Sequence, residues 1–144
     1  KVLIIGRGVE KEKLVKFIKD NNLKKVVKII NFQNNPYPYI NKSDLFILTS
    51  KYEGLPNVLL EAAVLKKFII SSDCPTGPKE ILLNGKGGFL FKEGNYKDLS
   101  NKILNFAKNK KNLKSKINYN YKNLIRFDFY KNLNKYYNAI NKLL

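Results

Sequence analysis

Two carboxylates with seven residues between them, Glu53 and Glu61, are the side chains of this sequence best suited to do chemistry. They flank a Gly-Leu-Pro turn, which follows the mainly apolar run 44–48 and leads into a second apolar segment. This order predicts a strand, a turn and a helix. In an open parallel sheet, the turn after a strand lies at the edge where such folds bind ligands. The two carboxylates are therefore expected to approach one ligand from two sides.

The turn itself predicts an anion site at the start of the helix. Pro56 suits the first helical position, because it has no N–H group to leave unpaired there. The amides of Asn57 and Val58 would then point out of the helix start, which carries about half a positive charge and favours a phosphate. Glu61 would lie roughly 6 Å further along the helix, within reach of sugar hydroxyls attached to that phosphate.

Longer stretches of the sequence carry a resemblance to a known family. Residues 50–62 read Ser-Lys-Tyr-Glu-Gly-Leu-Pro-Asn-Val-Leu-Leu-Glu-Ala, and residues 3–8 read Leu-Ile-Ile-Gly-Arg-Gly. The stretches 32–46, 71–82 and 85–90 follow in the order that the family shows. On these motifs the chain resembles glycosyltransferase family 4, closely over about its first 100 residues and loosely over its C-terminal part.

The resemblance implies both a fold and a function. Members of this family are retaining enzymes of the GT-B fold, in which a donor-binding and an acceptor-binding domain face each other. The chain resembles the donor-binding half of an enzyme that moves a hexose or N-acetylhexosamine from a nucleotide sugar, expected to be a UDP sugar, to a glycan or lipid-linked acceptor. The expected setting is cell-envelope glycan biosynthesis, in the cytoplasm or peripherally at the cytoplasmic membrane face. GT-B enzymes generally use helix ends and basic side chains, so neither a metal nor another cofactor is expected.

The resemblance also assigns roles to particular residues. Glu53 becomes the catalytic candidate, in contact with the transferred sugar or with charge near its anomeric carbon, and Glu61 is expected to hold the ribose hydroxyls. Main-chain amides of the turn would bind the diphosphate, and the loop after the next strand would border the donor sugar. The substrate-binding residues expected on this basis are Glu61, Gly54, Leu55, Asn57, Val58, Thr76 and Gly77. The nucleobase is expected near residues 32–35.

The 144 residues fit one domain with its own core. In the family, one more strand and helix of the donor domain would precede residue 1, and the acceptor domain would precede these. We therefore expect a truncated, single nucleotide-sugar-binding domain over residues 1–144, with the acceptor bound by a missing N-terminal domain. Such a chain would bind a donor weakly and transfer nothing by itself.

Alternating elements predict an α/β fold. Short apolar runs alternate with helical patterns up to residue 91, which is typical of a parallel sheet with helical crossovers. The expected strands are 2–5, 26–30, 44–48, 68–71 and 88–91, and the expected helix of the site is 56–65. We expect a Rossmann-like open parallel sheet flanked by helices, with a helical C-terminal tail from Tyr96 onward.

The formal net charge of +17 indicates anionic partners, and its distribution limits which ones are expected. The lysines are spread along the whole chain, and arginine, the better reader of bases and phosphates, occurs only at Arg7 and Arg126. Specific nucleic-acid binding is therefore not expected, whereas contact with an anionic membrane surface fits a lipid-linked acceptor. The alternative function of a different class is a noncatalytic basic interaction module that binds an anionic polymer or membrane.

Other chemistries find less support in the sequence. With no histidine and one cysteine, Cys74, the chain offers neither a Cys–His pair nor a cluster of metal ligands. Gly6-Arg7-Gly8 begins like a dinucleotide fingerprint, but Lys11 stands where the third glycine belongs. A GT-B-like epimerase or phosphorylase is the other enzyme alternative, and the environment of the two glutamates favours transfer over it. Taken alone, the two glutamates could also be surface or capping carboxylates.

Overall fold

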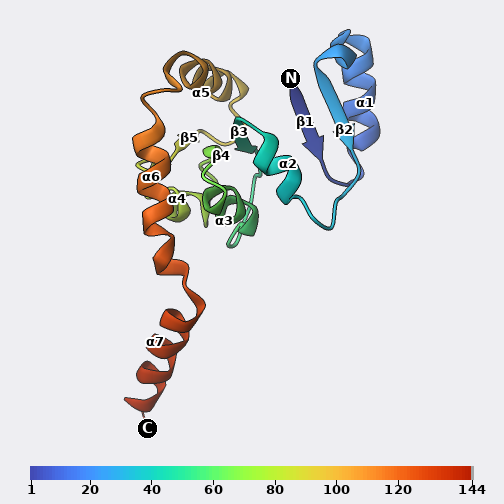
Figure 1. Ribbon diagram of the computed structural model, residues 1–144. Helices are drawn as coiled ribbons and strands as arrows, with labels where there is room; N and C mark the ends of the chain where they lie inside the picture. Colours follow the sequence, from blue (N-terminus) through green and yellow to red (C-terminus); the bar gives the residue numbers. More distant parts are fainter. Residues whose placement is uncertain (144) are drawn as a thin grey trace. The chain divides into compact units, whose positions relative to one another are not determined.

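The computed structural model describes residues 1–143 of the chain (Figure 1). They form two compact units, residues 1–36 and the residues from 37 onward. Both units contain parallel strands connected through helices, so the predicted α/β class with a Rossmann-like parallel sheet is confirmed. That the two units together make one nucleotide-sugar-binding domain remains a prediction.

The first unit is a βαβ motif. It consists of strand β1 (Val2–Ile5), helix α1 (Lys11–Asp20), the short 3-10 segment η1 (Leu23–Lys25) and strand β2 (Val27–Ile30). β1 and β2 pair in parallel with Val2 opposite Val27, so the connection between them must cross over, and α1 provides it. β2 begins one residue later than predicted, because the Val26 N–H donates to the Leu23 carbonyl (2.9 Å) and closes η1.

The second unit is built on a three-stranded parallel sheet. Its elements in chain order are α2 (Tyr37–Lys42), β3 (Leu45–Leu48), α3 (Asn57–Val64), β4 (Phe68–Ser72), α4 (Pro78–Ile81) and β5 (Phe89–Phe91). The strand order is β3-β4-β5, with Leu45 opposite Phe68 and Ile70 opposite Phe89. Because parallel strands point the same way, the segments after β3, β4 and β5 lie at one edge of this sheet.

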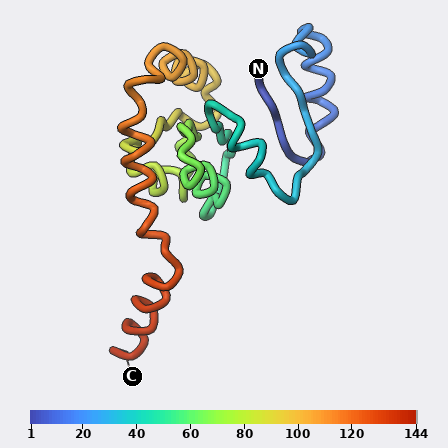
Figure 2. The backbone as a smooth tube through the Cα atoms, viewed as in Figure 1, coloured from blue at the N-terminus to red at the C-terminus, as the bar shows by residue number. Residues whose placement is uncertain are grey.

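Beyond β5 the chain is helical, as predicted. It forms α5 (Tyr96–Asn109), α6 (Lys114–Lys122), the 3-10 segment η2 (Asn123–Phe127) and α7 (Phe129–Asn141), which follow one another along the tube in Figure 2. Asn95 and Asp128 start α5 and α7, since their side chains accept a backbone N–H that the first turn leaves unpaired. Every residue of α7 is exposed. Among residues 1–143, no helix combines the length and the apolar character needed to span a membrane.

The central strand β4 is buried at every position and contributes to two hydrophobic cores. Successive side chains of a strand point to opposite faces of the sheet. Ile69 packs on one face with residues of α3 and α4, among them Leu59. Phe68 and Ile70 pack on the other face with Phe106 of α5. β4 therefore holds the helices of both faces in place.

Phe68 allows a test of this core. Its ring is 1% exposed, and its centroid lies 5.2 Å from that of Phe106 in a stacked arrangement. Phe68→Ala is expected to lower the free energy of unfolding by about 3–5 kcal/mol, because it removes buried apolar surface and leaves a cavity. Phe129→Ala, at a position that is 69% exposed, is the matched control and should change it by less than about 0.5 kcal/mol. Urea unfolding followed by circular dichroism measures both, and equal losses would contradict this core.

Candidate functional site

The turn between β3 and α3 carries the predicted anion site. Pro56 has an extended conformation (φ −71°, ψ 92°), and its carbonyl accepts a hydrogen bond from the Leu59 N–H (2.9 Å). The prediction that Pro56 is the first helical residue is therefore wrong by one position, because its extended ψ keeps it outside the helix. Asn57 and Val58 begin α3, so their N–H groups have no acceptor within the helix. Both residues are exposed, and a phosphate there would meet free donors at the positive end of the helix dipole.

Glu61 lies one turn further into α3 and has a buried oxygen without a hydrogen-bond partner. This atom, Oε2, is the only carboxylate oxygen in that condition in the part of the chain that the structure describes. Its burial follows from the helix face, since Leu59, Ala62 and Ala63 around it are packed into the core. A buried polar group left unpaired costs about 1–3 kcal/mol. Oε2 itself is closed to solvent, but the residue is half-buried, so a turn of the carboxylate would bring this oxygen to the exposed side, where a ligand with hydroxyl groups would supply the missing donor.

The loop after β4 is fastened to the turn after β3 by two hydroxyl groups. The Ser72 hydroxyl donates to the carbonyl of Ser50, with an oxygen–oxygen distance of 2.6 Å. The Thr76 hydroxyl donates to the carbonyl of Glu53. Two segments that the sequence predicts at the donor site are thus bonded to each other.

Gly77 allows the loop after β4 and the turn after β3 to approach each other closely. Its φ is +86°, and a Cβ built at this position would lie 2.4 Å from the Gly54 carbonyl oxygen and 2.4 Å from Pro56 Cδ. Glycine is therefore needed both for the positive φ and for the space.

The predicted site residues all lie in the second unit and differ in exposure. Glu53 and Glu61 are half-buried, and Gly77 is buried. The others are exposed: Gly54, Leu55, Asn57, Val58 and Thr76. The Glu53 carboxylate takes part in none of the ion pairs formed within residues 1–143. It is therefore available to a ligand. What each of these residues contacts in a bound substrate remains a prediction.

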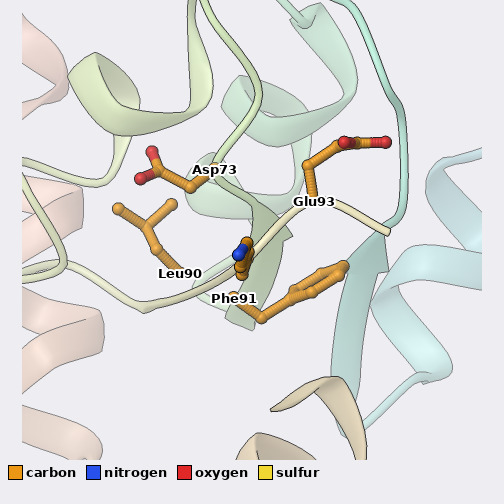
Figure 3. Close-up of a pocket in the computed structure, with 5 residues that line it drawn as sticks. Asp73, Leu90, Phe91 and Glu93 are labelled. Atoms are coloured by element: carbon orange, nitrogen blue, oxygen red, sulfur yellow. The ribbon is translucent and has the colours of Figure 1, made fainter. Parts of the chain in front are cut away.

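A hollow of about 310 Å³ opens at the same edge of the sheet (Figure 3). It is lined by Asp73, Leu90, Phe91, Lys92 and Glu93. Asp73 follows β4 directly, pairs with Lys79 (3.1 Å) and donates its N–H to the carbonyl of Phe91 (2.8 Å). Lys92 and Glu93 are not among the residues that the sequence predicts for the site. Their place immediately after a strand is the signal that could have found them.

Two further features bear on the predicted ligand. Residues 1–143 contain no group of three or more His, Cys, Asp or Glu side chains that could hold a metal ion. In the first unit, the Arg7 guanidinium lies 5.2 Å from the centroid of the Phe32 ring, and Phe32 is exposed. An exposed aromatic ring can stack on a base, and the position of a nucleobase near residues 32–35 remains a prediction.

Comparisons with known proteins agree with one another. The family model described as glycosyl transferases group 1 matches residues 1–123. An uncharacterized glycosyltransferase of Methanocaldococcus jannaschii is 43% identical over 82 residues, which are 57% of this chain and 20% of that protein. The N-acetylgalactosamine-N,N'-diacetylbacillosaminyl-diphospho-undecaprenol 4-alpha-N-acetylgalactosaminyltransferase of Campylobacter jejuni is 35% identical over 95 residues, 66% of this chain and 26% of that protein.

A solved structure extends the similarity to nearly the whole chain. A point mutant of TarM from Staphylococcus aureus, crystallised with fondaparinux, alpha-GlcNAc-glycerol and UDP, superimposes with a TM-score of 0.86 at 28% identity. The match covers 96% of this chain and 28% of that one. The chain spans between 20% and 26% of the length of the two curated relatives.

Gly77→Ala tests whether the two loops are fastened together at the site. Gly94→Ala is the matched control, because Gly94 also has a positive φ (+71°) but a Cβ placed on it would have nothing within 4 Å. In both variants the positive φ costs the alanine about 1–2 kcal/mol of backbone strain. Only in Gly77→Ala does the new Cβ also collide with Gly54 and Pro56 and displace the turn after β3. We expect Gly77→Ala to lower the free energy of unfolding by about 1–3 kcal/mol more than the control, and to shift the amide NMR signals of residues 53–58. Equal losses in urea unfolding, with those signals unmoved, would contradict the contact.

Proposed function

The chain belongs to the glycosyl transferases of group 1, and we propose that it forms the donor-binding part of a retaining enzyme of this family. The proposed reaction moves a hexose or an N-acetylhexosamine from a UDP sugar to a glycan or lipid-linked acceptor. The observation that carries this proposal is the buried Glu61 Oε2, which lacks a donor one turn away from the unpaired amides of Asn57 and Val58. A nucleotide sugar supplies both missing partners, a phosphate for the amides and ribose hydroxyls for the carboxylate.

The donor is proposed to bind along the first turns of α3. Its diphosphate accepts hydrogen bonds from the helix start, including the amides near Gly54 and Leu55, and the helix dipole favours the negative charge. Its ribose lies roughly 6 Å further along, at about 1.5 Å per residue, and donates to Glu61. Each hydrogen bond to the carboxylate can contribute about 1.5–3 kcal/mol. The fold shared with a protein crystallised with UDP supports this arrangement.

Transfer of the sugar is proposed to depend on Glu53. When the bond between the anomeric carbon and the diphosphate oxygen breaks, positive charge develops on the sugar ring and negative charge on the leaving group. The Glu53 carboxylate, which no cation within residues 1–143 neutralises, would stabilise the first charge. The amides at the start of α3 would stabilise the second. The loop with Thr76 and Gly77 borders the sugar.

The acceptor is proposed to bind to parts of the enzyme outside these 144 residues, since the relatives are several times longer. On this proposal the chain alone binds a donor without transferring its sugar, and it acts without a metal or other cofactor. The net charge of +17 supports peripheral contact with the anionic cytoplasmic face of a membrane during cell-envelope glycan biosynthesis. The same charge favours the competing function, a noncatalytic basic module that binds an anionic polymer or membrane.

Glu61→Ala is expected to weaken UDP binding and to leave the fold intact. The Kd for UDP should rise about tenfold to a hundredfold, because the hydrogen bonds to the ribose are lost. The free energy of unfolding should not fall, because the variant also loses a buried carboxylate oxygen that nothing pairs. Glu12→Ala, at an exposed position in the first turn of α1, is the control that should leave the Kd unchanged and lower the free energy of unfolding by less than about 1 kcal/mol. Isothermal titration calorimetry with UDP and urea unfolding measure the two effects.

Two results of these titrations would speak against the donor site. Wild-type affinity for UDP in Glu61→Ala would contradict the role of this carboxylate. Binding of a short single-stranded oligonucleotide in place of UDP, with NMR shifts spread over the lysines, would favour the basic module.

Removal of divalent cations is expected to leave UDP binding unchanged. The proposed site neutralises the diphosphate with helix amides, so it needs no metal to hold the charge. The same titration in EDTA and in excess Mg²⁺ measures this. A Kd that rises more than about tenfold in EDTA would contradict metal-independent binding.

A further inference from the structure

Two hydroxyl groups behind the proposed donor site hold the turn that carries Glu53. We infer that Ser72 and Thr76 are positioning residues, which fix the Glu53 carboxylate against the transferred sugar without taking part in the nucleotide contacts. This inference rests on the proposed function. It adds to that function the residues that determine how the sugar part of the donor is held.

Ser72 can act only from behind the turn. It is the last residue of β4 and has no exposed surface, so it cannot touch a ligand. Its hydroxyl donates to the Ser50 carbonyl at 2.6 Å, which joins the buried central strand to a residue 22 positions earlier in the chain. The start of the turn is thereby tied to the element around which both cores are packed.

Thr76 makes the second link, three residues further along the turn. Its hydroxyl donates to the backbone carbonyl of Glu53. Between the two links lie residues 51 and 52, which are both exposed. The turn is thus held at two points on either side of this exposed stretch, so the conformation of residues 50–53 depends on these two hydrogen bonds, whereas the turn beyond Glu53 is also held by its close contact with Gly77.

Glu53 depends on the links because its side chain forms no ion pair within residues 1–143. Its carboxylate therefore has no charged partner of its own within these residues, and its backbone, from which the side chain starts, is held by Thr76. A group that acts on a substrate must be held to within about 0.5 Å. A misplacement of about 1 Å can cost on the order of a hundredfold in rate.

Glu61 does not depend on the same links. It lies on α3, which is held by its own backbone hydrogen bonds and by Leu59, Ala62 and Ala63 in the core. Loss of the links should therefore affect the sugar part of the donor most and the diphosphate contacts near Gly54 less, and it should spare the contact of the ribose with Glu61. A general loss of stability would not make this distinction, since it would weaken all of these contacts.

Titrations with UDP, UDP-N-acetylglucosamine and UDP-glucose test the inference. The ratio of the Kd for UDP to the Kd for a UDP sugar measures what the sugar adds to binding. We expect Ser72→Ala and Thr76→Val to lower this ratio about threefold to tenfold, while the Kd for UDP rises by a smaller factor than the Kd for either UDP sugar. Thr76→Ser keeps the hydroxyl and should restore the ratio. Ser100→Ala, at an exposed position of α5, should leave it unchanged.

Each other outcome has a defined meaning. A wild-type ratio in both Ser72→Ala and Thr76→Val would overturn the inference, and so would an equal rise of every Kd, which indicates a general loss of folding. Thr76 lies at the surface, so Thr76→Val remains available if Ser72→Ala does not fold. Shifted amide NMR signals of residues 50–54 in the ligand-free variant would support positioning, and unmoved signals would assign a lower ratio to a direct contact of Thr76 with the sugar and overturn the inference. Failure of the wild-type chain to bind UDP at all would overturn the proposed function, and this inference with it.

Discussion

Burial of β4 on both of its faces is the constraint on which the second unit depends. Ile69 packs toward α3 and α4, and Phe68 and Ile70 pack toward α5, so one strand holds the helices on both sides. Its parallel pairing with β3 and β5 brings the ends of three strands to one edge. The turn before α3, the loop before α4 and the hollow after β5 meet there. Because the cores supply the stability, side chains at this edge are available for a ligand.

Polar groups at this edge fall into two kinds. Some are paired within the fold, such as the hydroxyls of Ser72 and Thr76, which bond to the turn after β3, and Asp73, which pairs with Lys79. Others have no partner, and Glu61 Oε2 is the buried example. The first kind gives the edge its shape, and the second carries an unfavourable free energy of about 1–3 kcal/mol that a bound ligand can offset. This contrast separates supporting residues from the proposed contact residues.

Much of the fold was predictable because its elements depend on neighbours along the chain. The run 2–5 is β1 as expected, and β4 extends the predicted strand by one residue to Ser72. Local rules favour proline at a helix start but do not fix its position, so Pro56 was misplaced by one residue. The two glutamates stood out because flanking motifs reinforced their spacing. The hydrogen bond from Thr76 to Glu53 joins residues 23 positions apart, so no local sequence pattern predicts it. The burial of Glu61 Oε2 likewise arises only from tertiary packing.

The central claim is that the start of α3 and Glu61 together hold a nucleotide. A crystal structure of the chain with UDP tests this most directly. We expect a ribose hydroxyl within about 3.2 Å of a carboxylate oxygen of Glu61, with the carboxylate turned toward the ligand, and a diphosphate oxygen at the N–H of Asn57 or Val58. UDP bound among surface lysines away from α3, with Glu61 Oε2 still without a hydrogen-bond donor, would contradict it.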